Sequence, residues 1–560
     1  SETSCNGFDD NEGTHRNEIL YAPTMESDPL LDTKRSLYTL KAVAEEAASI
    51  YAICWKISLA TFCQLSVLTI STAFLGHLGT RELAASAMVM SVVGGFRIIP
   101  WAFSISISTL GGHAYGAKNY ELVGVWLQIG LIMLVPVSAL LMAVCLNIRP
   151  CLELMTDDLE LLAMGETYAW YVSWSVWPSA IYEALRYGKH PSRSPAFSKL
   201  IHQLARGYYK AQEIMTPTTV VDVTTLFISI GVNYVFIYGC LGWPGFGFIG
   251  SPLALVFIAV IQSVSLWSFA HLLQERHTSV CVYRGTAHQP PSPERSLCVE
   301  TWFGWKAKHC LNAARLHQYL TLTGTFLVYL ALDEWVYNVL AIMAGKKILL
   351  LLNHSTTTMY VARIGSLNVA AYNILFTIWT LAYGVYIGFS TPIQVRVSHA
   401  LGANDPAKAK QSAVVGCAMG SFAAGFLSVA MYVGRDEMLA LYTADVDLQD
   451  VIRPVLGLFC LAACLSGVHI TLSAMLEAMS LAGTLVLASS VGSWLVLLPV
   501  AYELAFATSW GFGGLYIGSV IGESVKLVIM AVALMWVFDW HVVAEQVSKQ
   551  VTSDNEEFDV

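Results

Sequence analysis

Long blocks of apolar residues alternate with short polar connections along most of the chain. A block of about 20 apolar residues can cross the hydrocarbon core of a bilayer as a helix. The pattern predicts twelve membrane-spanning helices, at 52–76, 84–110, 122–146, 161–185, 212–239, 249–273, 319–344, 367–392, 410–433, 452–476, 482–507 and 513–538. The expected fold class is therefore an all-α membrane protein.

Composition and charge agree with this interpretation. Of the 560 residues, 55% are hydrophobic and only 13% are charged, and the mean hydropathy is +0.57. Nucleic-acid binding is not expected, because the net charge is −9 and the basic residues lie in separate loops. Most Lys and Arg residues fall in loops and tails that become cytoplasmic when both termini are cytoplasmic, so the positive-inside rule predicts that topology.

Short motifs that occur twice indicate an internal repeat. His113 follows the motif that begins at Gly79 by 34 residues, and His399 follows the similar motif that begins at Gly365 by the same distance. A third pair consists of Gly245-Phe-Gly-Phe-Ile-Gly-Ser251 and Gly511-Phe-Gly-Gly-Leu-Tyr-Ile-Gly-Ser519. The chain is therefore expected to contain two parallel repeats of six helices.

Two segments do not fit the repeat, namely 188–207 and 345–362. Both begin with Gly-Lys, which a splice-donor sequence would encode, so retained introns and lineage-specific loops are both open explanations. The expected organisation is a polar cytoplasmic tail (1–45), a first lobe (46–273), a cytoplasmic linker (274–318), a second lobe (319–538) and a cytoplasmic tail (539–560).

Several motifs resemble the multidrug and toxic compound extrusion (MATE) family of transporters, eukaryotic branch. They are Gly76-His-Leu-Gly79, Gly112-His-Ala-Tyr-Gly-Ala-Lys118, Tyr209-Lys-Ala-Gln212, Gly247-Phe-Ile-Gly-Ser251 and Arg396-Val-Ser-His-Ala-Leu-Gly402. The resemblance implies a V-shaped fold with two six-helix lobes around a central cavity. It also implies export of organic cations, xenobiotics or amphipathic metabolites by antiport, with protons favoured over sodium as the coupling ion.

No motif points to an enzyme or to ATP as the energy source. Gly345-Lys346-Lys347 lacks the upstream glycine and the Ser/Thr of a phosphate-binding loop, and the chain contains no zinc-protease or nucleophile-elbow motif. We expect no cofactor and no metal. The expected partners are a small organic substrate and the lipid bilayer of the plasma membrane or of a vacuolar or lysosomal membrane, and the protein is expected to be monomeric.

Ionisable residues within membrane spans are costly and are functional candidates for that reason. The strongest candidate is the segment Asp333-Glu334-Trp-Val-Tyr337-Asn338 in the seventh span. In the eukaryotic branch this segment commonly reads Glu-Trp-Trp-x-Tyr/Phe-Glu, so Asp333 takes the place of the first glutamate and Asn338 that of the second. Glu334 could serve instead after a one-residue rotation of the helix. These four residues are expected to bind the proton or the substrate, and a merely structural ion pair is the alternative.

The tenth span adds His469 and Glu477 to the candidate proton or substrate site. Family members often have aspartate where Ser466 falls and arginine where Glu477 falls. His469 could compensate, because histidine titrates near neutral pH, and a packing role is the alternative. Two other functions stay open. One is a flippase for lipid-linked precursors, and the other is a non-transporting receptor or scaffold, which Ser466, Glu477 and the two non-repeating segments raise. Four further charges in spans are expected to form structural ion pairs: Arg97, Glu183, Asp222 and Lys526.

Overall fold

The computed structural model describes residues 29–96, 98–153, 158–174, 208–213, 215–240, 242–262, 264–265, 310, 312–344, 366–442 and 446–556. The chain divides into two units, Ser1–Glu45 and Glu46–Val560, and the features below belong to the second unit except for the beginning of α1, which lies in the first. Both non-repeating segments, 188–207 and 345–362, and the charged residues Arg97 and Glu183 lie outside the described residues.

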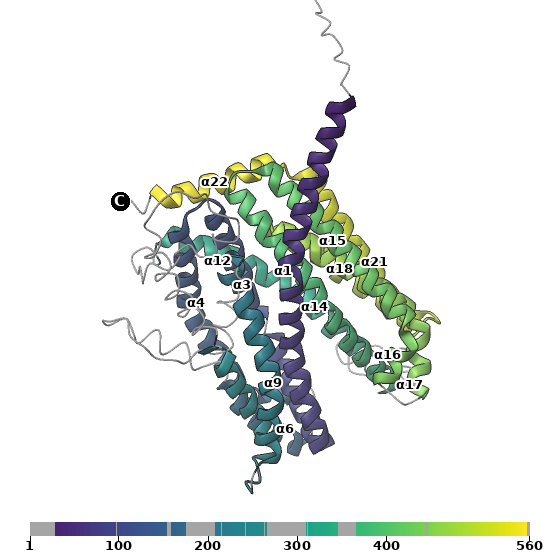
Figure 1. The fold of residues 1–560 in the computed structure, drawn as a ribbon. Coiled ribbons are helices and arrows are strands. Elements are labelled where there is room, and N and C mark those ends of the chain that lie inside the picture. Colours follow the sequence, from purple (N-terminus) through teal and green to yellow (C-terminus); the bar gives the residue numbers. More distant parts are fainter. Residues whose placement is uncertain are drawn as a thin grey trace, which may run out of the picture. The chain divides into compact units, whose positions relative to one another are not determined.

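Helices make up nearly all of the regular structure in these ranges (Figure 1). Those of the first half are α1 (Pro29–Leu78), α2 (Thr80–Gly95), α3 (Ile98–Gly116), α4 (Tyr120–Leu146), α5 (Arg149–Glu153), α6 (Leu159–Ser173), α9 (Thr216–Tyr238) and the short 3-10 turn η1 (Gly247–Ile249). Those of the second half are α12 (Ala313–Ala344), α14 (Ser366–Gly402), α15 (Pro406–Val433), α16 (Arg435–Tyr442), α17 (Val446–Ile452), η3 (Arg453–Val455), α18 (Leu456–Ala478), α19 (Ala482–Ser489), η4 (Ser490–Leu497), α20 (Leu498–Tyr502), η5 (Glu503–Ala507), α21 (Phe512–Val532), η6 (Ala533–Val537) and α22 (Trp540–Glu556).

Nine helical stretches in the described ranges are long and apolar enough to cross a membrane. Three of the twelve expected spans are not among them. The spans at 161–185 and 249–273 are described only in part, and α12 is long enough but carries Asp333 and Glu334 in its apolar stretch. The all-α membrane fold class is thereby confirmed.

The repeat is visible in how the helices begin. Lys118 and Asn404 both have a positive φ, near 61° and 54°, and each lies two residues after the end of a helix, α3 and α14 respectively. The next residues, Asn119 and Asp405, then cap α4 and α15, because their side-chain oxygens accept a hydrogen bond from a backbone N–H in the first turn. The two halves therefore reproduce the same turn at corresponding positions.

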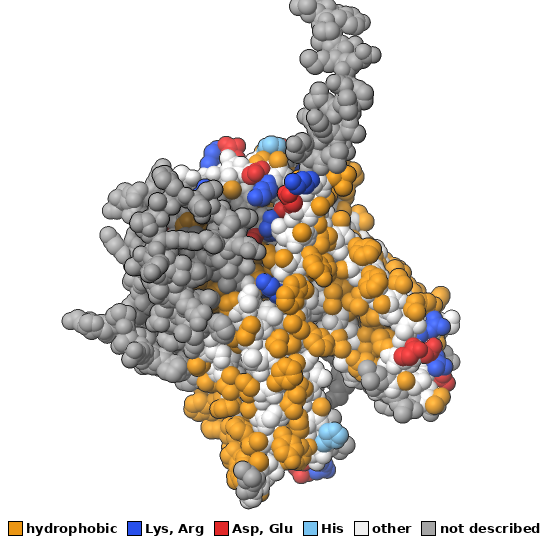
Figure 2. All heavy atoms as spheres, in the orientation of Figure 1, with side chains coloured by type: hydrophobic (Ala, Val, Ile, Leu, Met, Phe, Trp, Pro, Cys, Tyr) orange, Lys and Arg blue, Asp and Glu red, His pale blue; other side chains and the backbone are white. Residues whose placement is uncertain are grey.

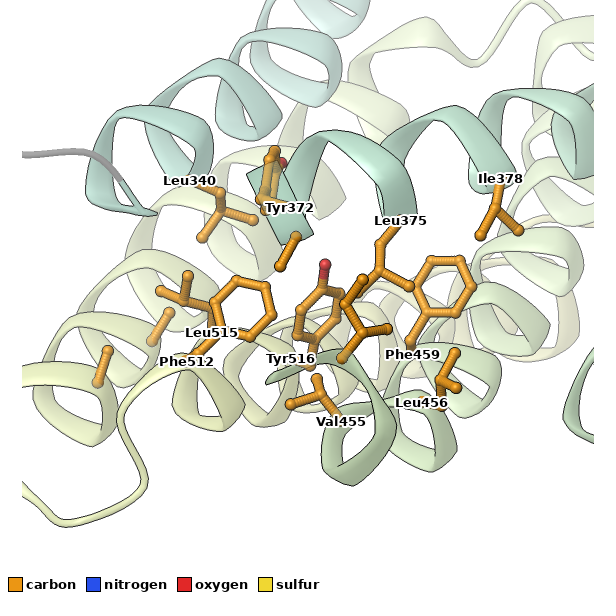
Figure 3. Packing of buried hydrophobic residues seen from close by; sticks show 14 of the residues in the cluster. Leu340, Tyr372, Leu375, Ile378, Val455, Leu456, Phe459, Phe512, Leu515 and Tyr516 are labelled. Carbon is orange, nitrogen blue, oxygen red and sulfur yellow. The ribbon is translucent and has the colours of Figure 1, made fainter. Parts of the chain in front are cut away.

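The arrangement of side chains suits a lipid environment. Large apolar side chains are exposed along α15, for example Phe422 and Phe426, and Figure 2 shows hydrophobic side chains covering much of the helical surface. The buried side of the second half packs α12, α14, α18 and α21 around one apolar cluster, part of which Figure 3 shows. This cluster fixes the helices that carry the charged residues described next.

Candidate functional site

Three helices bring a group of ionisable residues together inside the second half. α12 supplies Asp333, α18 supplies His469, and α21 supplies Glu523 and Lys526. Residues three apart on a helix lie on the same face, so Glu523 and Lys526 face the other helices together. We call Asp333, His469, Glu523, Lys526 and Tyr337 the charged cluster.

Lys526 is the centre of the charged cluster and its side chain is 0% exposed. Its Nζ donates to Asp333 Oδ1 over 2.8 Å and lies 2.7 Å from Glu523 Oε1. Ser489 Oγ adds a hydrogen bond to Asp333 Oδ1 at 3.4 Å. A buried ammonium is costly unless it is paired, and here two carboxylates compensate it. Lys526 thus forms the intramembrane ion pairs expected of it.

Asp333 and Glu334 have different environments although they are adjacent in sequence. Trp494 Nε1 donates to the carbonyl oxygen of Leu332 over 2.9 Å, which holds this turn of α12 against η4. In that orientation the ion pairs of Lys526 among the described residues are with Asp333 and Glu523. Glu334 is half-buried on the neighbouring face. The packing therefore places Asp333 in the ion pair with Lys526, and the choice between Asp333 and Glu334 as the functional carboxylate stays a prediction.

Glu523 has one oxygen held by donors and one that faces His469. Tyr337 OH donates to Oε1 over 3.2 Å. Oε2 lies 3.5 Å from His469 Nδ1, yet neither Oε2 nor His469 Nε2 has a hydrogen-bond partner within the described residues. Glu523 and His469 side chains are each only 2% exposed. A buried acceptor without a donor is unusual, so this oxygen is open to a proton or a cation.

The formal charge of the charged cluster is −1 when both carboxylates are ionised, Lys526 is protonated and His469 is neutral. Lys526 cancels one carboxylate and leaves the other uncompensated. One added positive charge, from a proton or from a bound cation, makes the site neutral. An uncompensated charge in a low-dielectric interior is costly.

A small cavity adjoins the charged cluster and has Glu523 and Ser466 among its lining residues. Half of its lining residues are aromatic, namely Tyr337, Tyr372, Phe376, Trp379, Phe459 and Tyr516. Figure 3 shows Tyr372, Phe459 and Tyr516 in the packed cluster on that side. Its volume is about 50 Å³, enough for about three or four water molecules, whereas sites for drug-sized ligands have about 300 Å³ or more. A bulky ligand can enter only if the aromatic rings move apart.

The structure brings some of the site residues expected from sequence together and places the others elsewhere. Asp333, Tyr337 and His469 meet in the charged cluster. Asn338 is exposed on another face of α12. Glu477 lies eight residues beyond His469 on α18, which is about 12 Å along the helix, and Asp222 is buried in α9. The sequence analysis missed Glu523; its signal was a carboxylate three residues before a lysine inside an apolar span.

A second feature joins the two halves where α3 crosses α14. His113 Nε2 contacts the carbonyl oxygen of Ala478 at 2.7 Å, and His399 Nε2 contacts that of Ala211 at 2.7 Å. A carbonyl oxygen can only accept a hydrogen bond, so Nε2 of each histidine is the donor. These two bonds are related by the repeat, because each histidine reaches from its own half to the other. We call this region, with Gly116 and Gly402, the α3/α14 crossing.

Ion pairs reinforce one side of the α3/α14 crossing. Arg396 Nε and Nη2 each lie 2.6 Å from an oxygen of Glu46, and Ser412 donates to Glu46 over 2.7 Å. Glu213 lies 3.5 Å from both Arg396 and His399. Burial raises the pKa of Glu213, but the contact with His399 and the charge of Arg396 outweigh this and hold that pKa below its ordinary value.

Comparison with known proteins then identifies the family. The family model described as MatE matches residues 57–188 and 343–502, together more than half of the chain. The protein belongs to the MATE family. It is thus a multi-pass integral membrane transporter, and its relatives are transporters and not enzymes. The two matched segments fall in the two halves that the repeated motifs define.

Curated relatives and solved structures agree with this assignment. Multidrug and toxin extrusion protein 1 of Homo sapiens is 24% identical over 483 residues, covering 86% of this chain and 73% of the relative. Protein DETOXIFICATION 1 of Arabidopsis thaliana is 24% identical over 535 residues, covering 95% and 98%. A crystal structure of a eukaryotic MATE transporter matches with a TM-score of 0.72 at 18% identity, covering 91% and 99% of the two chains. A Vibrio cholerae MATE transporter in the bent form matches with 0.67 at 15% identity, covering 92% and 99%.

Proposed function

We propose that this MATE protein exports organic cations, xenobiotics or amphipathic metabolites by antiport against protons. The observation that carries the proposal is the charged cluster beside an aromatic-lined cavity, with Glu523 shared by both. Aromatic faces attract organic cations, and a buried carboxylate can exchange a cation for a proton. The printed names of the human and Arabidopsis relatives, which refer to toxin extrusion and detoxification, support the same substrate class.

Transport in proteoliposomes tests this proposal. A purified wild-type protein should move 1-methyl-4-phenylpyridinium against its gradient when a pH gradient is imposed, and a sodium gradient of the same size should not replace it. Asp333→Asn should abolish the pH-driven movement and leave insertion intact, because an amide is less costly than a charge in the membrane.

Glu334→Gln is the matched control for that change, because Glu334 is the adjacent carboxylate on α12 and Lys526 does not pair with it among the described residues. It should lower the rate less than Asp333→Asn does. Undiminished transport in both single variants and in the double variant would remove α12 from the mechanism. Absence of any pH-driven flux in the wild type would exclude proton antiport of this substrate class.

A further inference from the structure

We propose that α22 is a strap that holds the two halves together over the α3/α14 crossing. Its first turns stay fixed to the second half, while its far end, at Val551, is bound to the first half and is released when the crossing opens. The inference goes beyond the proposed function, because it concerns the opening of the protein and requires no substrate and no coupling ion. It rests on the two separate apolar clusters to which the buried side chains of α22 belong.

The sequence of α22 is amphipathic. The helix runs from Trp540 to Glu556 and is not one of the nine stretches in the described ranges that are long and apolar enough to cross a membrane. Its buried side chains recur at helical spacing and therefore share one face. They are Val543, Ala544, Val547 and Val551. The residues between them are mostly polar and exposed, for example Glu545 and Lys549. An apolar face of α22 is therefore packed against the protein, and a polar face is left exposed.

The first turns of α22 are fixed to the second half. The helix follows η6 after only two residues, so a short connection joins it to α21 and η6. Three of its side chains, Val543, Ala544 and Val547, belong to one apolar cluster with side chains of α14, α15 and α18. That cluster includes Ala400, which directly follows His399 of the crossing. This part of α22 should therefore move with the second half.

The last turns of α22 are bound to the first half. Val551 belongs to a different apolar cluster, which contains side chains of α3 and α4. That cluster includes Ala114, which directly follows His113 of the crossing. α22 accordingly contacts α3 as well as α14 and α15, and Figure 1 shows it lying across the upper ends of helices from both halves. One helix thus joins the packing beside both histidines of the crossing.

The two ends of α22 are held with different strength. Three buried side chains and the chain connection hold it to the second half. Of the α22 side chains that the structure describes, Val551 alone belongs to the first-half cluster. Separation of the halves should therefore expose Val551 and leave the other end in place. Truncation of a buried valine to alanine removes the burial of about two methylene groups, which should favour the separated state about tenfold.

A thiol buried at the crossing tests the strap in the detergent-solubilised full chain. Ser108→Cys replaces a residue of α3 that is 1% exposed and lies opposite Gln394 of α14, so a water-soluble reagent should reach it when the halves separate. In this background Val551→Ala should raise the labelling rate about tenfold, and Val551→Asp at least as much. Val542→Ala and Val542→Asp are the matched controls, because Val542 is on the same helix and is 49% exposed. They should leave the rate unchanged.

A double variant distinguishes a strap from two independent contacts. Once Val551 is released, the other end of α22 no longer acts on the crossing, so Val547→Asp with Val551→Asp should label no faster than Val551→Asp alone. Multiplied effects would overturn the proposal, as would unchanged labelling in the Val551 variants or equal acceleration in the Val542 controls. If the aspartate variants do not reach the membrane, Val551→Ala against Val542→Ala decides. The assay involves no transport, so absence of pH-driven flux in the wild type would defeat the proposed function and leave this test intact.

Discussion

Adding a methyl group at the α3/α14 crossing should open the contact between the two halves. A Cβ at position 116 would lie 2.7 Å from the carbonyl carbon of His399, and one at position 402 would lie 2.8 Å from that of His113. Ordinary van der Waals contact begins at 3.4 Å. Gly116→Ala therefore requires the backbones to separate by at least 0.7 Å, the difference between 3.4 and 2.7 Å.

That separation is large enough to weaken the hydrogen bonds that hold the α3/α14 crossing. If it is transmitted to the two histidine bonds, each now 2.7 Å long, they stretch to about 3.4 Å, where little of their strength is left. Each such bond contributes about 1 kcal/mol net. Losing both costs about 2 kcal/mol, which raises the population with a separated crossing about thirtyfold.

Thiol labelling measures this population. Ser108→Cys places a thiol at a position that is 1% exposed and lies at the crossing opposite Gln394. A membrane-impermeant reagent should react with it about thirtyfold faster in Gly116→Ala or Gly402→Ala than in the parent. Gly425→Ala in α15 is the matched control, because a Cβ there meets no atom within 4 Å, and it should leave the rate unchanged. Equal labelling in the parent and in both crossing variants would refute the steric argument.

Two further expectations concern the charged side of the α3/α14 crossing. Glu46→Ala leaves Arg396 buried without its bidentate partner, and it should destabilise the detergent-solubilised protein by about 3 kcal/mol. In a thermal melt, Glu153→Ala at the exposed pair with Arg149 should have a much smaller effect, and equal effects would contradict a special role for Glu46. The pKa of Glu213 is lowered in the folded protein, so ionised Glu213 stabilises the fold. This stabilisation is complete above the ordinary pKa of 4.5 and is lost as pH falls through the lower folded value. Labelling of Ser108→Cys, corrected for thiol ionisation, should therefore stay constant from about pH 8 to pH 5.5 and rise only below about pH 4.5; a rise near pH 6.5 would show that another group controls the crossing.

Much of the fold follows from sequence because membrane helices depend on local composition. The ends of the expected spans at 122–146 and 482–507 agree with α4 and with the stretch Ala482–Ala507 within a few residues. The equal spacing from Gly79 to His113 and from Gly365 to His399 anticipates the repeat, and the structure shows why those histidines recur. Each donates to a carbonyl of the opposite half.

The site was predictable only in part, because its partners are distant in the sequence. Lys526 and Asp333 are separated by 193 residues, and an apolar helix with one charge does not indicate which other helix it faces. Glu523 was missed for that reason. The choice between Asp333 and Glu334 depends on rotation of α12, and contacts such as the hydrogen bond from Trp494 to Leu332 fix that rotation through tertiary packing.

One helix connects the charged cluster with the α3/α14 crossing. α18 carries His469 beside Glu523 and, nine residues later, the carbonyl of Ala478 that accepts from His113. These positions are about 13 Å apart along a continuous helix. α14 makes the same connection, since Trp379 lines the cavity and His399 lies at the crossing. A substrate too large for a cavity of about 50 Å³ must displace the rings on these helices. Where that displacement carries α14 or α18 with it as a rigid element, it also strains the histidine bonds, which are the contacts through which occupancy of the cavity would act on the crossing.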